Sequence, residues 1–374
     1  MKRGVRIALA VVMIVSVMAV GLIGCAKEAP PAPAPPTPAP ALPKPAPPPP
    51  APPKVEPIIL KYADTGAATV ANRKAMVDVF DEIEKLTDGR VQHECYWSQS
   101  LLKSKDLTDG VRVGTADAGS TPSMIYHPAT FPIWNFSGLL FLGGGDQWGV
   151  SKAWTEMAET NPLLKEEIDK LGLIWLGMYG YPTTLMTIPP VAKLEDLKGV
   201  RMRAVGATAK WMAEIGATAV PMTFYEIPEG LARGVIDGTE GYVYAHYAWK
   251  YYEYCKFLTI TPIANRLILN SWLNVDTYNK LPPDIQKIYL KAWREGYPEG
   301  FVKYCDEELE MQLKAFKDAG LEFIELTPDE FARWKDSFAF VIDGYYEKMD
   351  KIGVDGRKII AQYEELYKKY ERKK

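Results

Sequence analysis

Short apolar runs alternate with amphipathic stretches along the chain from about residue 57 onward. Apolar runs bounded by turn residues are typical of buried strands, and apolar residues three or four positions apart are typical of helices. The first part of the chain predicts strands at 58–63, 90–96 and beyond 114–119, with helices at 72–86 and 101–113. Such alternation indicates βαβ units on a mostly parallel sheet.

A second set of alternating elements begins near Gly172. It predicts strands at 173–179 and 184–188, a strand–helix–strand unit at 196–222, a helix at 225–233, an extended apolar run at 258–275 and a long helix at 284–317 with a kink at 296–300. The remaining residues are mostly helical in pattern. We therefore expect an α/β fold with two lobes, each a mostly parallel sheet flanked by helices, and a long C-terminal helical region.

The extended run at 258–275 suggests that the chain crosses between the lobes more than once. We expect the first lobe to comprise residues 57–179 and 268–308, and the second to comprise 180–267 and 309–374. Small ligands bind in the cleft between such lobes, at the carboxyl ends of the strands.

The first 24 residues have a basic start and an apolar run from Ile7 to Ile23, which are the parts of an export signal. The run ends in Leu-Ile-Gly-Cys, which resembles a bacterial lipobox and implies cleavage before Cys25 and lipidation of its thiol. The alternative is an uncleaved transmembrane anchor. In either case the rest of the chain would lie outside the cytoplasm.

Residues 25–56 are rich in proline and alanine and cannot form a core. This composition favours an extended polyproline II segment of about 3.1 Å per residue, so the proline-rich part would span on the order of 80 Å. Its position directly after Cys25 indicates a tether that holds the folded region away from a membrane.

The formal net charge is -3, and no basic cluster suggests nucleic-acid binding. Aromatic residues make up 11% of the chain, which suits an aromatic-lined cleft, although we expect most of them in the core. Cys95, Cys255 and Cys305 are too widely spaced for a disulfide framework or a metal site, and we expect all three to be buried apolar residues.

Enzyme motifs are missing from the sequence. There is no Gly-x-Ser-x-Gly elbow and no P-loop, and the three histidines are scattered without an HExxH pattern. Since catalysis needs a positioned acid, base or nucleophile, we expect a binding protein rather than an enzyme.

Arg201 and Arg203 lie two positions apart in a predicted strand, which places both on one face of the sheet. For Arg203 the alternatives are ligand binding and a structural ion pair. For Arg201 we favour a surface ion pair with a neighbour such as Glu195.

The region around these arginines resembles the DctP-type solute-binding proteins of TRAP transporters. The resemblance rests on an ordered series: Asp-Leu-Lys-Gly-Val-Arg-Met-Arg at 196–203, Gly-Ala at 216–217, Val-Pro-Met at 220–222, Phe224, and Gly-Val-Ile-Asp-Gly at 234–238 followed by Glu240. It extends from about Ile58 to the C-terminus. It implies a class II-like periplasmic-binding-protein fold whose two lobes close on an organic acid and deliver it to an ion-driven TRAP permease.

The resemblance places the family's carboxylate-binding arginine at Arg203. A guanidinium group matches a carboxylate in a bidentate manner, and its charge is costly to bury unless an anion neutralises it. The second arginine of many family members is absent from residues 180–184. We therefore expect a monocarboxylate ligand, such as a keto, hydroxy or aromatic acid.

No organic cofactor is expected. Some family members hold a cation beside the ligand, which would give Glu240 a role in binding Na⁺ or Ca²⁺; the alternative is that Glu240 orients Arg203 by hydrogen bonding. The other ligand-binding candidates, for which core packing or solvation is the alternative, are Asp64, Ser123, Tyr126, Tyr181, Thr183, Phe224, Tyr242 and Trp272.

We thus expect an extracytoplasmic lipoprotein that captures a small organic acid for a TRAP permease. A ligand-binding subunit of a sensor or of another permease, and an extracytoplasmic hydrolase, are the alternatives. The C-terminal helical region would also offer an apolar face to a homodimer.

Overall fold

The computed structural model describes residues 56–66, 71–260 and 265–372, all within one unit that runs from Lys54 to Lys374. The predicted export signal, the lipidation site Cys25 and nearly all of the proline-rich tether lie outside these residues. Within them, no helix has the length and apolar character needed to cross a membrane.

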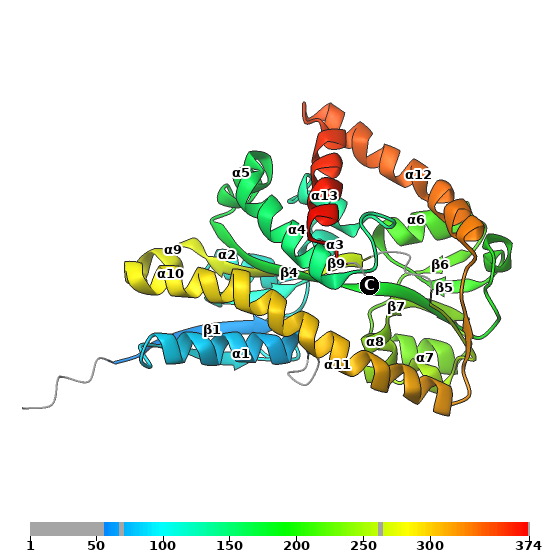
Figure 1. Ribbon diagram of the computed structural model, residues 1–374, viewed down its shortest axis with the longest axis horizontal. Coiled ribbons are helices and arrows are strands. Elements are labelled where there is room, and N and C mark those ends of the chain that lie inside the picture. Colours follow the sequence, from blue (N-terminus) through cyan, green and yellow to red (C-terminus); the bar gives the residue numbers. More distant parts are fainter. Residues whose placement is uncertain (1–55, 67–70, 261–264, 373–374) are drawn as a thin grey trace, which may run out of the picture. The chain divides into compact units, whose positions relative to one another are not determined.

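The described strands form two mixed sheets that share one long strand, β4 (Figure 1). Their bounds are β1 (Ile58–Asp64), β2 (Val91–Tyr96), β3 (Ala118–Thr121), β4 (Leu173–Thr187), β5 (Arg201–Arg203), β6 (Thr218–Val220), β7 (Gly238–Tyr242), β8 (Phe257–Thr259), β9 (Asn265–Asn274) and β10 (Glu322–Ile324).

The first sheet has the order β2-β1-β3-β9-β4, and the second continues through β4-β7-β5-β6, with β8 pairing to β4 and β10 pairing to β8. The β1 and β5 strands pair in parallel with both of their neighbours, whereas β4 and β9 run antiparallel to theirs. This confirms the predicted two-lobed α/β fold, with crossover strands that make the sheets mixed rather than mostly parallel.

Helices cover both faces of these sheets (Figure 1). Their bounds are α1 (Ala71–Leu86), α2 (Leu107–Arg112), α3 (Ser123–Tyr126), α4 (Gln147–Thr160), α5 (Pro162–Asp169), α6 (Gly206–Glu214), α7 (Ile227–Ala232), α8 (Val243–Ala248), α9 (Val275–Lys280), α10 (Pro283–Lys291), α11 (Tyr297–Asp318), α12 (Pro328–Lys351) and α13 (Gly356–Tyr370). Short helical turns lie at η1 (Trp134–Gly138), η2 (Leu194–Leu197), η3 (Tyr251–Glu253) and η4 (Ala292–Gly296).

Helix α11 contacts α1 beside the first sheet and α8 beside the second, so it braces the two. The kink predicted at 296–300 stays a prediction, and a π-helical turn, η4, ends at Gly296 beside Pro298, where helices commonly bend. Helix α13, which we assigned to the second lobe, packs against α4 of the segment assigned to the first. The exact lobe boundaries stay a prediction.

Two local predictions were wrong. The strands expected at 173–179 and 184–188 form the single strand β4, because β9 pairs with its first part as far as residue 182 and β7 pairs with it from Thr183 onward.

The helix expected at 101–113 begins only at Leu107. The Gln99 side-chain oxygen accepts hydrogen bonds from the Ser104 backbone N–H and hydroxyl, both at 3.0 Å, which stabilises a loop there instead.

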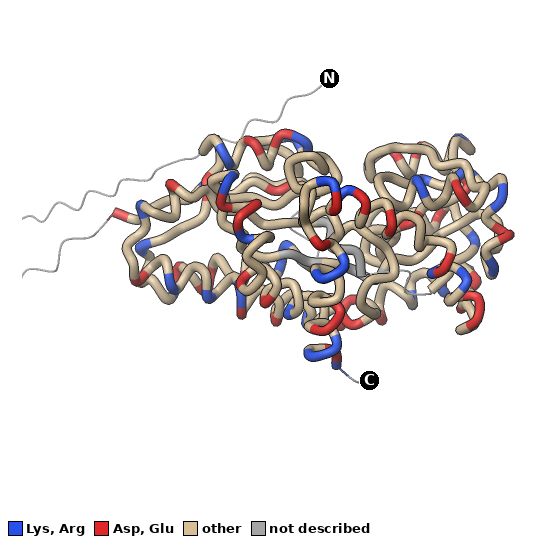
Figure 2. Tube along the Cα trace, turned by 90° about the horizontal axis from the view of Figure 1, so that it is seen from above, with Lys and Arg blue, Asp and Glu red and all other residues tan. Residues whose placement is uncertain are grey.

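Large aromatic side chains fill the core, as expected from the composition. Six tryptophans are among the largest fully buried side chains: Trp134, Trp154, Trp211, Trp272, Trp293 and Trp334. Along the Cα trace in Figure 2, positions of Lys and Arg are interspersed with positions of Asp and Glu.

Candidate functional site

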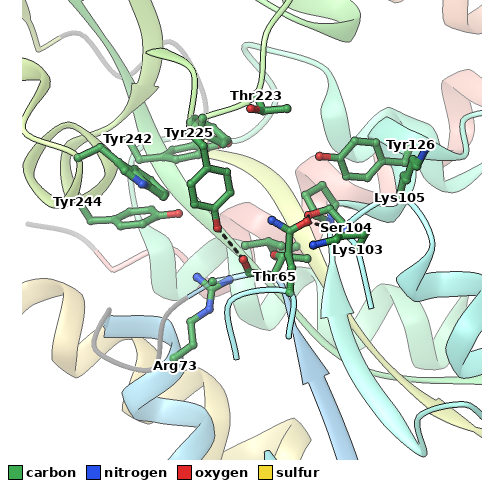
Figure 3. Close-up of a pocket in the computed structure, with 16 residues that line it drawn as sticks. Thr65, Arg73, Lys103, Ser104, Lys105, Tyr126, Thr223, Tyr225, Tyr242 and Tyr244 are labelled. Carbon is green, nitrogen blue, oxygen red and sulfur yellow. Dashed lines mark hydrogen bonds between the residues drawn. The ribbon is translucent and has the colours of Figure 1, made fainter. Parts of the chain in front are cut away.

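A cavity of about 290 Å³ lies where loops at the carboxyl ends of strands from both sheets meet (Figure 3). The first sheet contributes the loops after β1, β2 and β3, and the second contributes the loop after β6 and the residues at the end of β7 and in α8. The lining residues are Thr65, Gly66, Arg73, Gln99, Lys103, Ser104, Lys105, Pro122, Tyr126, Thr223, Phe224, Tyr225, Tyr242, Tyr244, Trp249 and Leu269.

The described lining is rich in cations and aromatic rings. It contains three basic residues (Arg73, Lys103 and Lys105), six aromatic residues, and no Asp, Glu or His. Figure 3 shows Tyr242 and Tyr244 on one side of the cavity and Tyr126, Lys103 and Lys105 on the other, with Tyr225 between them. Such a lining favours a ligand with a negative charge and a flat or apolar body.

Arg203 lies behind this lining rather than in it. It ends β5 and is only 5% exposed. Its Nε atom donates a hydrogen bond to the Met222 backbone oxygen at 3.0 Å, and its guanidinium carbon is 4.3 Å from the centre of the Phe224 ring. Phe224 also stacks on Trp249, with ring centres 5.6 Å apart. Arg203 therefore supports the aromatic wall through a cation–π contact.

Burial raises the pKa of Tyr126, while hydrogen bonding with Ser104 and the positive charge of Arg203 oppose that rise. The position of Arg203 relative to the cavity follows from its contact with Phe224, which lines the cavity and lies over the guanidinium group.

A buried ion pair fixes Arg73 at the edge of the cavity. The Asp64 carboxylate is completely buried and accepts hydrogen bonds at Oδ1 from Arg73 Nε (2.9 Å), Arg73 Nη2 (2.7 Å) and the Gly66 backbone N–H (2.7 Å). Burial nevertheless raises the pKa of Asp64, with Arg73 opposing the shift. Asp64 therefore anchors Arg73, and Arg73 is the residue of this pair that faces the ligand space.

A hydrogen bond joins the two sides of the cavity. The Tyr225 hydroxyl, in the loop after β6, donates to the Thr65 backbone oxygen, in the loop after β1, over 2.8 Å (Figure 3). This bond can form only when the two loops approach each other, so the structure represents a closed arrangement of the cavity walls.

A family model described as bacterial extracellular solute-binding protein, family 7 (DctP), matches residues 63–349. The chain belongs to this family. The match confirms the predicted resemblance to TRAP solute-binding proteins, and the family consists of solute-binding proteins rather than enzymes.

Proteins similar to this chain are also named as solute-binding or ligand-binding proteins. The C4-dicarboxylate-binding periplasmic protein DctP of Rhodobacter capsulatus is 26% identical over 309 residues, covering 80% of this chain and 89% of the relative. The 2,3-diketo-L-gulonate-binding periplasmic protein YiaO of Escherichia coli is 26% identical, covering 65% and 74%. A crystal structure of a TRAP periplasmic solute-binding protein from Desulfovibrio salexigens is 32% identical, covers 85% of this chain and 98% of that one, and superposes with a TM-score of 0.75.

The family 7 fold brings three of the predicted ligand-binding residues into the cavity lining: Tyr126, Phe224 and Tyr242. Thr183 and Glu240 lie close by on the paired strands β4 and β7, are almost completely buried, and do not line the cavity. Tyr181 belongs to β4, but its side chain lies outside the described residues.

Ser123 and Trp272 instead pack in the core of the family 7 fold. The Ser123 hydroxyl accepts hydrogen bonds from Trp272 Nε1 at 2.7 Å and from Thr108 Oγ1 at 2.9 Å, which uses its acceptor capacity within the protein. Trp272 is fully buried and stacks on Phe131 with ring centres 5.4 Å apart. Both residues take the core role that was the alternative to ligand binding.

Arg201 forms a surface ion pair as predicted, but with a different partner. It binds both carboxylate oxygens of Asp237, with Nε to Oδ2 at 2.8 Å. Glu195, the neighbour that we expected to pair with it, binds Arg333 instead. The reason is that β5 and β7 are adjacent parallel strands, so Asp237 precedes β7 directly beside Arg201.

Cysteine and metal predictions can be compared with the described residues only. The three cysteines there are free, Cys255 and Cys305 are buried, and Cys95 is half-buried, which corrects the prediction for Cys95. Within the described part of the chain, no three His, Cys, Asp or Glu side chains are grouped as metal ligands would be. A cation role for Glu240 stays a prediction.

Sequence reasoning missed several lining residues of this family 7 protein. Arg73 follows the expected helix cap Asn72, and its place in the helical pattern marks it only as polar. Lys103, Ser104 and Lys105 lie in the segment that was expected to be helical. The dense aromatic run from Tyr242 to Tyr254 was the available signal for Tyr244 and Trp249.

Proposed function

We propose that this protein captures a small organic acid in the cavity between its two sheets and delivers the acid to a TRAP permease. The observation that carries the proposal is the described lining, which combines three cations with six aromatic residues and includes no carboxylate. Two relatives named for binding C4-dicarboxylate and 2,3-diketo-L-gulonate support the organic-acid class.

Arg203 is the residue that we propose binds the ligand's carboxylate. It lies at the carboxyl end of β5, directly behind the lining residue Phe224. A charge-assisted, bidentate hydrogen bond to a carboxylate is roughly twice as strong as a neutral one. Lys103 and Lys105, which are exposed at the opposite side from Tyr244, would attract the anion to the cavity before it binds.

A monocarboxylate with an aromatic or apolar body fits the rest of the cavity best. Phe224, Tyr242, Tyr244 and Trp249 present ring surfaces. Burial raises the pKa of Tyr244 to about 12, so its hydroxyl group stays neutral at physiological pH. Arg73 is already bound to Asp64, so we do not assign a second carboxylate of the ligand to it.

Ligand-dependent closure would link capture to delivery. The Tyr225–Thr65 hydrogen bond joins loops from the two sheets, and a ligand that contacts both walls would favour the same arrangement. A permease that recognises the closed form would then receive loaded protein. The proposed lipidation of Cys25 and the proline-rich tether would keep the protein beside the membrane that holds the permease.

A thermal-shift screen of the full chain against organic acids and their amides tests this proposal. A ligand that binds only the native state raises the melting temperature by mass action. We expect a shift with a monocarboxylate and no shift with the matching amide, and a shift that needs added Ca²⁺ or Na⁺ would assign Glu240 as a cation ligand. Equal shifts with acid and amide, or no shift with any acid, would contradict the proposal.

A further inference from the structure

A second cavity, of about 120 Å³, lies directly behind one wall of the ligand cavity. It is bounded by α8 and the C-terminal half of α11. The residues that matter for its character are Val243, Ile260, Cys305, Leu309 and Leu313. It is therefore a mainly apolar space at the back of the proposed site.

Polar residues also line the second cavity, namely Gln147, Thr184, Glu308 and Gln312. Glu308 accepts a hydrogen bond from Lys74 at 2.5 Å and another from Gln312 Nε2 at 3.2 Å. These contacts satisfy Glu308 within the protein, whereas the buried Oε1 atom of Gln147 has no hydrogen-bond partner among the described residues.

Tyr244 is the residue that lines both cavities. Its ring stacks on Tyr242 with centres 5.7 Å apart and planes within 5° of each other. Burial raises the pKa of its hydroxyl group, and the positive charge of Arg73, which the buried Asp64 holds in place, opposes that rise. The stack on Tyr242 orients the ring, which forms a wall between the two spaces.

The wall stands opposite the cationic side of the ligand cavity. Figure 3 shows Tyr244 and Tyr242 on the side away from Lys103, Lys105 and Tyr126. The second cavity is therefore reached from the end of the ligand cavity that Tyr242 and Tyr244 line, away from Lys103 and Lys105.

We propose that Tyr244 limits the length of the acid that this protein accepts, by closing the ligand cavity off from an apolar extension subsite behind it. The inference rests on the proposed function, because it assumes that an acid binds in the first cavity. It names Tyr244 as a specificity-determining residue and an apolar chain as the group that the second cavity would take.

Removing the ring should join the two cavities. In a Tyr244→Ala variant, each methylene group added to the ligand would be buried in the second cavity instead of meeting the wall. Burial of one methylene group raises affinity by about fourfold. The order of affinities in a length series should therefore reverse between the wild-type protein and the variant.

The test is isothermal titration calorimetry of the full chain with benzoate, phenylacetate, 3-phenylpropionate and 4-phenylbutyrate. We expect the wild-type protein and Tyr244→Phe, which keeps the ring, to bind the shorter acids better. We expect Tyr244→Ala to gain about fourfold per added methylene. Adding Leu313→Trp, which fills the second cavity, should remove that gain.

Three results would overturn the inference alone. One is a Tyr244→Ala variant that keeps the wild-type order, and another is a gain that Leu313→Trp does not reduce. The third is a wild-type protein that already prefers 4-phenylbutyrate and loses it in Leu313→Trp, because Tyr244 would then not close the cavity. If Tyr244→Ala shows no cooperative melting transition, and so does not fold, a Tyr244→Leu variant replaces it. We expect Tyr244→Leu to show the same gain in affinity for the longer acids.

The proposed function fails differently. If the wild-type protein binds none of these four acids and none in the wider screen, both the function and the inference built on it are overturned. Binding of benzoate together with an unchanged length order leaves the function standing and removes only the role of Tyr244.

Discussion

The two ends of strand β5 carry the same residue type in very different surroundings. At its amino end, Arg201 is exposed and binds Asp237, which directly precedes the neighbouring strand β7. At its carboxyl end, Arg203 is buried and contacts Met222 and Phe224 in the loop after β6. Alternation along the strand places both arginines on one face of the sheet. They differ in the edge of the sheet at which they lie: Arg201 forms a surface ion pair at one edge, and Arg203 lies at the proposed binding site at the other. Ligands bind at the carboxyl edge of such sheets.

The largest expected effect is at the buried end. Arg203→Ala should weaken binding of the best acid from the screen by roughly 100-fold or more, because the carboxylate loses two charge-assisted hydrogen bonds. Arg203→Lys should recover only part of this loss, since one ammonium group cannot bind both oxygens in the same way. Calorimetric titration measures the affinity of both variants for the acid. Unchanged affinity in Arg203→Ala would contradict the proposal that Arg203 binds the carboxylate.

A smaller effect is expected from the ring that covers Arg203. Phe224→Ala should weaken acid binding by roughly tenfold, because it removes a stacking surface and the cation–π contact with the guanidinium group. Phe224→Tyr keeps the ring and serves as the control. If the alanine variant binds the acid as tightly as the wild-type protein, then Phe224 is a packing residue and the aromatic character of the site is not used.

The closing contact should matter less again. Tyr225→Phe removes the hydrogen bond to the Thr65 backbone oxygen but keeps the ring. A single neutral hydrogen bond is worth about 1 kcal/mol, and Tyr225 is half-exposed, so we expect roughly threefold faster dissociation of the ligand. Stopped-flow dissociation kinetics measure this rate, and a slower rate in the variant would contradict a closing role.

The smallest effect is expected at the exposed end of β5. Arg201→Ala should leave acid affinity unchanged and lower the melting temperature slightly at neutral pH, because exposed ion pairs contribute little. This variant is the matched control for Arg203→Ala. Weaker acid binding in Arg201→Ala would mean that the two ends of the strand do not differ in function.

The same ion pair has a pH signature. The hydrogen bonds from Arg201 hold the pKa of Asp237 below its usual range. A carboxyl group with a lowered pKa in the folded state stabilises the protein above its unfolded pKa of about 3.9 and loses that contribution as the pH falls through the lowered value. The difference in melting temperature between the wild-type protein and Arg201→Ala should therefore be full at neutral pH and disappear in acid.

Local sequence patterns predicted most of the fold. The strand–helix–strand unit that contains Arg203 appears as β5, α6 and β6, because its apolar spacing and its turn residues lie within one short stretch. Strand β4 could not be predicted as one strand, because its continuity depends on pairing with β9 and β7, which are distant in the chain. The late start of α2 depends on the side-chain hydrogen bonds of Gln99, which compete with the helix.

The sequence predicted a lining residue of the cavity only where its position at the end of a strand was sufficient to place it there. Phe224 and Tyr126 follow the carboxyl ends of β6 and β3, Tyr242 ends β7, and all three line the cavity. Arg73 was missed because its role depends on the fold bringing the first turn of α1 against Asp64 at the end of β1. Contacts between segments of this kind leave no periodic signal in a single sequence.

A crystal structure of the protein with its best-binding monocarboxylate tests the central claim most directly. We predict that both carboxylate oxygens lie about 2.7–2.9 Å from guanidinium nitrogens of Arg203, with the body of the acid against Phe224. A carboxylate bound instead to Arg73, or to Lys103 and Lys105, would contradict the assignment of the buried end of β5 as the anion site.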